Sequence, residues 1–171
     1  MLKPKGIPFV NADLIAKEVF PDNPESRSYN AALIAEEMRT RLLREGRTFC
    51  FETVFSHPSK IDFLAQAKAN DYEIVLIFIH LDNVSLNHAR IAQRVGEGGH
   101  NVPPEKVETR IPRTLINVKT VLPLCDSVYL LDNSSAIEPF NQVALIHQGK
   151  LRIKSTPLPD WADNLLSSLC E

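Results

Sequence analysis

The sequence predicts an α/β fold with a mainly parallel sheet, and two features of the chain support this. Short apolar runs of strand length alternate with segments whose apolar residues recur at helical spacing. Such alternation favours parallel strands with helices packed on both faces of the sheet. Near the C-terminus, two β-prone runs flank Gln148-Gly149, which is typical of a β-hairpin. We therefore expect an α/β fold that ends in a hairpin.

The composition indicates one ordinary globular domain. The 171 residues are 44% hydrophobic and 23% charged, enough for one sizeable core. The 19 basic and 21 acidic side chains nearly balance, so the charge predicts neither a nucleic-acid nor a membrane partner. The first ten residues hold too short an apolar stretch for a signal peptide or a membrane span. With three widely spaced cysteines, the chain is predicted to be cytoplasmic.

The N-terminal part predicts a strand, a crossover helix and a second strand. The strands are expected at residues 7–10 and 48–55, and each delivers polar groups at its C-terminal end. The helix between them is expected to end near Gly46. Its apolar residues at helical spacing are Leu33, Ile34, Met38, Leu42 and Leu43.

The rest of the chain repeats the alternation of helix and strand. A glycine-rich loop is expected at residues 96–104, followed by a helical segment. Pro112 lies inside this segment and is expected to kink it or to divide it into two helices. The other helices are expected from Ile61, at residues 84–95 and after Pro159. The strands are expected at residues 72–81, 127–131, 143–147 and 151–154.

Two carboxylates follow apolar runs where ligands bind in open α/β sheets, at the carboxyl ends of strands. These are Asp13 and Glu52. A carboxylate there can accept the proton of an attacking hydroxyl or hold Mg²⁺. The alternative for Asp13 is an N-cap of the helix starting near Leu14. The alternative for Glu52 is a structural salt bridge, because its neighbours are core-like and buried charges need a partner.

Four arginines form two pairs on either side of the glycine-rich loop. Arg90 and Arg94 are four residues apart, and Arg110 and Arg113 are three apart, so each pair shares a helical face. Guanidinium groups can clamp a transferring phosphoryl group. Arginines on helix surfaces are more often merely solvated. The loop between the pairs is what favours the clamp.

The cysteines and histidines indicate no reactive centre. Cys50 and Cys125 lie in apolar, strand-like surroundings without a neighbouring base, which favours unreactive core thiols. His57 and His100 are interpreted as surface residues, and no cysteine or histidine spacing indicates a metal site.

The motifs in this order resemble the zeta-toxin-like P-loop kinases. The matching segments are FVNAD (9–13), GRTFCFET (46–53), RIAQRV (90–95), GGHNVP (98–103) and DNS (132–134). Each is weak alone, but the combination is specific. The resemblance implies a three-layer P-loop-kinase-like fold that transfers the γ-phosphate of ATP with Mg²⁺. The acceptor implied is a hydroxyl of a UDP-sugar, UDP-N-acetylglucosamine in the best-known members, and an antitoxin protein silences some members.

The resemblance also implies roles for particular residues. On the acceptor side, Asp13 becomes the general base for the sugar hydroxyl, and Glu52 positions the substrate beside Asn11 and Thr53. On the phosphoryl side, Arg94 and Arg110 neutralise the charge of the transferring group. The residues implied to contact ATP are Arg90, Arg94 and Arg113.

One part of the family pattern is missing. The family begins with a strand, a G-x-x-x-x-G-K-[ST] loop and a helix, all ahead of the segment that corresponds to residues 9–11. The Gly149-Lys150 pair is no substitute, because Ala144 and Leu151 stand where the motif needs glycine and Ser or Thr. We therefore expect one domain, residues 1–171, that lacks the first strand and the phosphate loop. Alone it should bind ATP weakly, because that loop holds the β and γ phosphates.

Three interpretations follow from the sequence. The first is a zeta-toxin-like kinase whose first strand and loop are encoded upstream of residue 1. The second is a non-catalytic remnant or binding module that keeps the acceptor crevice. The third is a P-loop kinase that phosphorylates another small metabolite.

Overall fold

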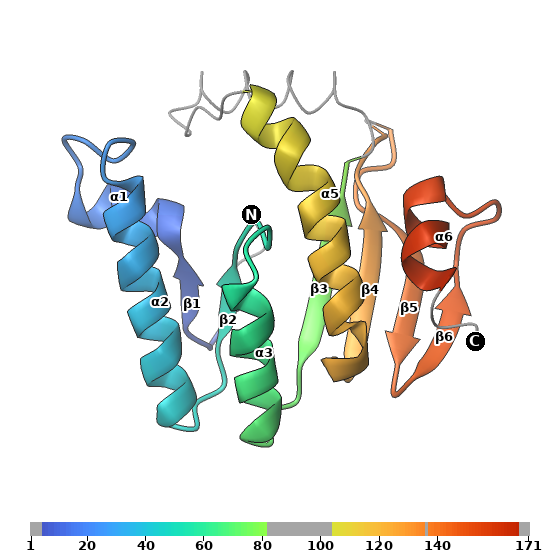
Figure 1. Cartoon of the computed structure of the whole chain (residues 1–171), viewed down its shortest axis with the longest axis horizontal. Helices are drawn as coiled ribbons and strands as arrows, with labels where there is room; N and C mark the ends of the chain where they lie inside the picture. The colour runs from blue at the N-terminus through green and yellow to red at the C-terminus, as the bar shows by residue number, and fades with distance from the viewer. Residues whose placement is uncertain (1–4, 82–103, 136, 168–171) are drawn as a thin grey trace. The chain divides into compact units, whose positions relative to one another are not determined.

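The computed structural model describes residues 5–81, 104–135 and 137–167, without the side chains of residues 104–108. They divide into two compact units, residues 5–54 and the described residues from Phe55 onward. Each unit has its own sheet, two-stranded in the first and four-stranded in the second (Figure 1). The predicted helix over residues 84–95 and most of the predicted glycine-rich loop lie outside the described residues.

The first unit packs two helices on a parallel strand pair. Its elements are β1 (Phe9–Asn11), α1 (Ala12–Val19), α2 (Ser28–Arg44) and β2 (Cys50–Glu52). β1 and β2 run parallel, as predicted, although both are shorter than the predicted strands, and β1 extends one residue past the first apolar run. The core comprises the buried Val10, Ala35 and Leu42 with Ala12, Ile15, Phe49 and Phe51 packed against them.

Helix α2 ends where the sequence predicts. Gly46 has φ +64°, a left-handed conformation that glycine adopts without a Cβ penalty. Its N–H donates to the Leu43 carbonyl at 3.1 Å, and the Arg47 N–H donates to the Leu42 carbonyl at 3.1 Å. These bonds satisfy carbonyls that the end of a helix leaves open. The glycine therefore stops α2 and turns the chain toward β2.

The buried face of α2 differs from the predicted one. Met38, expected to be buried, is 42% exposed, whereas the neighbouring Arg39 is only 5% exposed. Ala31 and Ala35 precede Arg39 at intervals of four, so the three share one stripe of the helix. The small alanines allow α2 to pack closely on the rest of the unit. The aliphatic stem of an arginine can be buried against apolar surface in such a stripe.

The second unit contains a mixed four-stranded sheet. Its elements are α3 (Ser59–Ala69), β3 (Val75–His80), α5 (Pro104–Val121), the 3-10 turn η1 (Leu122–Leu124), β4 (Ser127–Asp132), β5 (Asn141–His147), β6 (Lys150–Ile153) and α6 (Asp160–Leu166). The strand order is β3-β4-β5-β6; β3 and β4 are parallel, and the other pairs are antiparallel. The α/β class and the parallel pairs are confirmed, while the three-layer kinase arrangement stays a prediction.

The C-terminal hairpin is confirmed. Gln148 has φ +49° and Gly149 has φ +72°, so both central residues of the turn are left-handed. Two left-handed residues match the twist of the strands that they connect. β6 begins at Lys150, directly after the turn.

Helix α5 continues through Pro112 as one helix, so of the two predicted alternatives, a kink or two helices, the second is wrong and the first stays a prediction. Tertiary contacts hold the part that follows the proline. Asn117 donates to the Phe55 carbonyl at 2.9 Å, and Val118 and Val121 are fully buried. Neither α5 nor any other helix in the described ranges has the length and apolarity to cross a membrane.

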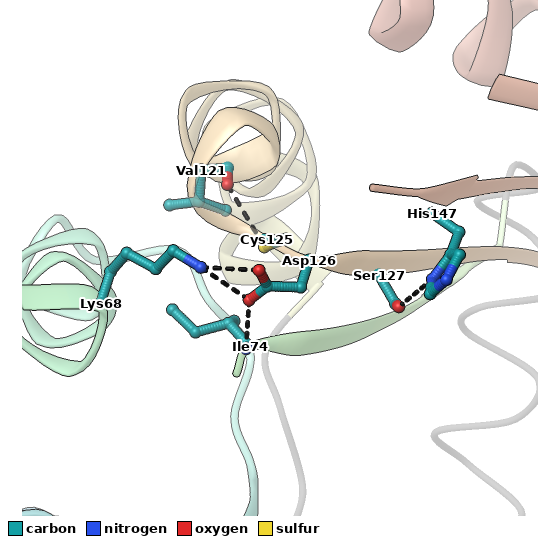
Figure 2. Close-up of polar contacts among 7 residues, drawn as sticks. All are labelled: Lys68, Ile74, Val121, Cys125, Asp126, Ser127 and His147. Carbon is teal, nitrogen blue, oxygen red and sulfur yellow. Dashed lines mark hydrogen bonds and ion pairs between the residues drawn. The ribbon is translucent and has the colours of Figure 1, made fainter. Parts of the chain in front are cut away.

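Asp126 joins the starts of two strands to helix α3 (Figure 2). Its carboxylate accepts hydrogen bonds from Lys68 Nζ at 2.7 and 2.8 Å and from the Ile74 N–H at 2.8 Å. Its backbone N–H donates to the Ile74 carbonyl at 2.9 Å. The bond from Lys68 and then that from Ile74 hold the pKa of the Asp126 carboxyl below its usual value. The carboxylate thus fixes where β4 begins beside β3.

We predict that Asp126→Asn destabilises the protein by about 1 kcal/mol at neutral pH, because the ion pair is lost and one bond to Ile74 weakens. A lowered pKa stabilises the fold above the unfolded pKa, about 3.9 for aspartate, and this gain disappears as the pH falls through the folded pKa. The difference in urea midpoint between wild type and variant should therefore shrink as the pH falls below about 3.9.

The control for this experiment is Asp71→Asn, because Asp71 is exposed and its left-handed φ of +60° also suits asparagine. The control should unfold like the wild type. Equal midpoints for Asp126→Asn and wild type at pH 7 would contradict the assigned role.

Candidate functional site

The carboxyl ends of β1 and β2 bring together four residues that the sequence singled out. Asn11 and Glu52 lie opposite each other in the parallel register. Thr53 directly follows Glu52, and Asp13 lies in the first turn of α1. Asp13, Glu52 and Thr53 are all exposed. The predicted acceptor-side residues therefore share one edge of the first unit.

The Asn11 side chain links the two strands to α1. Its Oδ1 accepts a hydrogen bond from the Leu14 N–H at 3.0 Å, and its Nδ2 donates to Glu52 Oε2 at 3.0 Å. Asn11 is only 6% exposed, so both ends of the amide are used inside the protein. This geometry makes Asn11 a residue that positions Glu52.

Asn11, and not Asp13, is the N-cap of α1. The N-cap interpretation of Asp13 is therefore wrong. The helix begins at Ala12, two residues before the predicted start, because an asparagine at the strand end already supplies the capping oxygen. The Asp13 carboxylate lies in the first helical turn, where the helix dipole favours a negative charge.

Glu52 is exposed, so the expected burial of this carboxylate is wrong. β2 ends at Glu52, and a side chain at the end of a strand can leave the core that the preceding phenylalanines enter. Within the described ranges, no lysine or arginine forms a salt bridge with Glu52. Its hydrogen-bond partner is the neutral amide of Asn11, which orients the carboxylate without neutralising it.

Arg39 is a residue of this unit that the sequence analysis missed. Its guanidinium lies 5.2 Å from the centre of the Phe51 ring, one residue before Glu52. Burial lowers the pKa of Arg39, and the nearby Glu36 charge acts in the opposite direction. The contact attaches α2 to β2 beneath the candidate site. The signal in the sequence was the stripe of Ala31, Ala35 and Arg39.

The predicted arginine clamp lies elsewhere in the chain. Arg110 and Arg113 both belong to α5 of the second unit, with Arg110 half-buried and Arg113 exposed. Arg90 and Arg94 lie outside the described residues. The grouping found in the first unit thus consists of polar and acidic side chains.

The Gly149-Lys150 pair does not fit the triphosphate of ATP. Gly149 lies in the tight turn of the hairpin and Lys150 starts β6, so this pair forms no phosphate-binding loop. In the part of the chain that the structure covers, no three His, Cys, Asp or Glu side chains gather as metal ligands. The chemistry available at the β1–β2 edge is that of oriented carboxylates that can accept hydrogen bonds and protons.

Comparison with known proteins shows one family to which the chain belongs. The fold is of the mixed α/β class. The chain is similar to an uncharacterized protein of Haemophilus influenzae (strain ATCC 51907 / DSM 11121 / KW20 / Rd), with 30% identity over 101 residues that cover 59% of this chain and 72% of that protein. The chain belongs to the family of that protein. No family model matches the chain, and no solved structure does.

The two hydrogen bonds of the Asn11 side chain predict that Asn11→Asp destabilises α1 to an extent that depends on pH. Asn11→Ala should destabilise the first unit by about 1–2 kcal/mol at any pH, because the cap and the bond to Glu52 are both lost. Asn11→Asp keeps a capping oxygen but places a second carboxylate beside Glu52. Its defect should be largest at pH 7 and should shrink toward about pH 4, as protonation removes the repulsion.

Amide hydrogen exchange in α1 measures these defects, because local opening of the helix sets the exchange rate. Asp22→Asn, an exposed change in the same unit, is the control. If Asn11→Asp loses protection equally at pH 7 and at the acidic end, the contact with Glu52 is unimportant.

The two described cysteines have raised thiol pKa values. Burial raises the pKa of Cys125 to about 12, and its thiol donates to the Val121 carbonyl at 3.3 Å (Figure 2). Burial also raises the pKa of Cys50, and the charge of Glu52 raises it further. Both thiols are protonated at neutral pH, which agrees with the prediction that they are unreactive.

We predict that Glu52→Gln speeds alkylation of Cys50 by iodoacetamide roughly twofold at pH 8, because the negative charge that raises the thiol pKa is removed. Mass spectrometry of a Cys170→Ser background measures the rate. Cys125 is the internal reference, since its rate should not change. Identical Cys50 rates in both proteins would show that the carboxylate does not act on the thiol.

Proposed function

We propose that this chain is the acceptor-binding part of a zeta-toxin-like, ATP-dependent phosphotransferase that acts on a hydroxyl of a UDP-sugar or similar small molecule. The observation that carries the proposal is the 3.0 Å bond from Asn11 to Glu52. It fixes one exposed carboxylate at the carboxyl end of a parallel strand, in the same unit as the Asp13 carboxylate.

The proposed chemistry divides two tasks between the carboxylates. Glu52 accepts a hydrogen bond from one hydroxyl of the sugar and so orients the ring, with the Thr53 hydroxyl beside it. Asp13 accepts the proton of the attacking hydroxyl, whose oxygen then becomes the nucleophile. Neither task needs a buried charge, in agreement with the exposure of these side chains.

The described residues supply few groups that could bind the phosphoryl donor. ATP with Mg²⁺ is the proposed donor, and a phosphate loop must hold it. Arg94, Arg110 and Arg113 are the proposed cations for the transferring group. Without the loop, the 171-residue chain is expected to have little or no kinase activity.

A non-catalytic binding module is the second candidate function. It is favoured by the position of Gly149-Lys150 in a hairpin turn, which leaves this pair unable to hold phosphate. Such a module would bind the UDP-sugar and leave it unchanged. An antitoxin-like protein is a proposed partner in either case.

We predict that the wild-type chain binds UDP-N-acetylglucosamine with a dissociation constant of about 1 mM or below, and that Glu52→Gln weakens binding about tenfold, because a charge-assisted hydrogen bond is lost. Asp13→Asn should bind nearly as well as wild type, since its proposed role is to accept a proton. NMR titration of the Asn11 and Glu52 amides measures both effects. Asp22→Asn is the matched control.

The outcomes separate the candidate functions. Absence of shifts at Asn11 and Glu52 up to about 10 mM ligand would reject the acceptor site. For the kinase, a version with a phosphate-loop segment added should phosphorylate the sugar, and Asp13→Asn should lower its kcat about 100-fold or more. Binding without turnover in that version favours the module, and turnover only with other small alcohols favours a different acceptor.

A further inference from the structure

The C-terminal hairpin concentrates positive charge. β6 carries Lys150 and Arg152, and Lys154 follows the strand directly. These three exposed residues are called the basic row. Residues 139–159 contain no aspartate or glutamate, although the whole chain has a formal net charge of -2. The charge of the hairpin therefore differs in sign from that of the whole chain.

The three cations lie on one face of the hairpin at regular intervals. The Lys154 N–H donates to the Val143 carbonyl at 2.9 Å, so the backbone bonding to β5 continues through Lys154. Alternate residues of a strand share a face and lie about 6.7 Å apart, so the basic row spans about 13 Å. The backbone of β6 thus fixes the spacing of the three charges.

The charges of the basic row are not neutralised by neighbouring side chains. The salt bridges among the described residues involve Arg41, Arg47 and Lys68 instead. Neither β5 nor β6 contains an acidic residue that could pair with the basic row across the hairpin. The three cations are therefore available for ion pairs with another molecule.

Apolar side chains accompany the basic row. Arg152 lies opposite the half-buried Leu145, which in turn lies opposite the half-buried Tyr129 of β4. Residues opposite each other share one face of a sheet. On the other face of β6, Ile153 is 55% exposed. Arginine and tyrosine are enriched at protein–protein interfaces, so the surroundings of the basic row favour a protein as its partner.

We propose that the basic row binds an extended acidic segment of another protein, with aspartate or glutamate at every second position. Such a segment repeats its carboxylates at about the 6.7 Å spacing of the row, so three ion pairs form together. Basic residues on an edge strand deter pairing with strands in general. A partner of opposite charge is not deterred, and the same residues therefore select it.

The basic row is less suited to a nucleic acid. Proteins that depend on phosphate contacts neutralise about six to ten phosphates, whereas the row offers three cations. The net charge of the chain also opposes a long polyanion. A short acidic segment matches both the number and the spacing of the three charges.

The experiment uses the synthetic peptide acetyl-EVEVE-amide, in which three glutamates alternate with valine. In NMR titrations of the 171-residue chain at about 50 mM salt, the peptide should shift the amides of residues 150–154 with a dissociation constant of about 1 mM or below. Arg152→Glu should weaken binding about tenfold, because a repulsion replaces an ion pair. The charge-reversed peptide acetyl-KVKVK-amide should bind Arg152→Glu better than it binds the wild type. A gain of binding cannot result from unfolding, so this exchange of charges controls for the fold of the variant.

Arg27→Glu is the matched control. It makes the same change of charge at an exposed residue of the first unit, at the start of α2, where an acidic side chain is tolerated. This variant should bind both peptides as the wild type does.

Three outcomes would overturn the proposal. The first is the absence of shifts in residues 150–154 up to about 10 mM acidic peptide. The second is equal binding of the two peptides by the wild type. The third is tighter binding of an oligothymidylate of about eight nucleotides than of the acidic peptide, because a nucleic acid would then be the ligand. The acceptor site is read at Asn11 and Glu52, so its test and this one succeed or fail separately.

Discussion

The second unit depends on the parallel backbone ladder between β3 and β4. Asp126 sets where this ladder starts, because its carboxylate and its N–H both bond to Ile74. A shift by one residue would move every side chain of the strand to the opposite face. The register thus places Phe78 and His80 against Trp161, and it places Val75, Ile77 and Ile79 on the opposite face of the sheet.

Asn11 has a role in the first unit comparable to that of Asp126 in the second. One amide group caps α1 and holds the Glu52 carboxylate, so the helix start and the strand end are fixed together. The bond involves no cation, and the carboxylate lies at an exposed edge. An oriented and accessible carboxylate is suited to accept hydrogen bonds from a ligand with hydroxyl groups.

Much of the fold was determined by local sequence. The alternation of strands and helices, the end of α2 at Gly46 and the hairpin at Gln148-Gly149 depend on residues within one or two turns of each other. Local chemistry therefore suffices to predict them. The absence of a phosphate-loop sequence among the 171 residues is also a property of the sequence alone.

The tertiary structure decided the partners of individual side chains. The sequence predicted Asp13 as the alternative cap of α1, and the structure gives this role to Asn11, which also contacts Glu52, 41 residues away. Likewise, the burial of Arg39 involves its contact with the distant Phe51, and the exposure of Glu52 depends on where β2 ends. Periodicity specifies which residues share a face. Only the pairing of segments far apart in the chain decides what each face meets, because that pairing depends on register and packing.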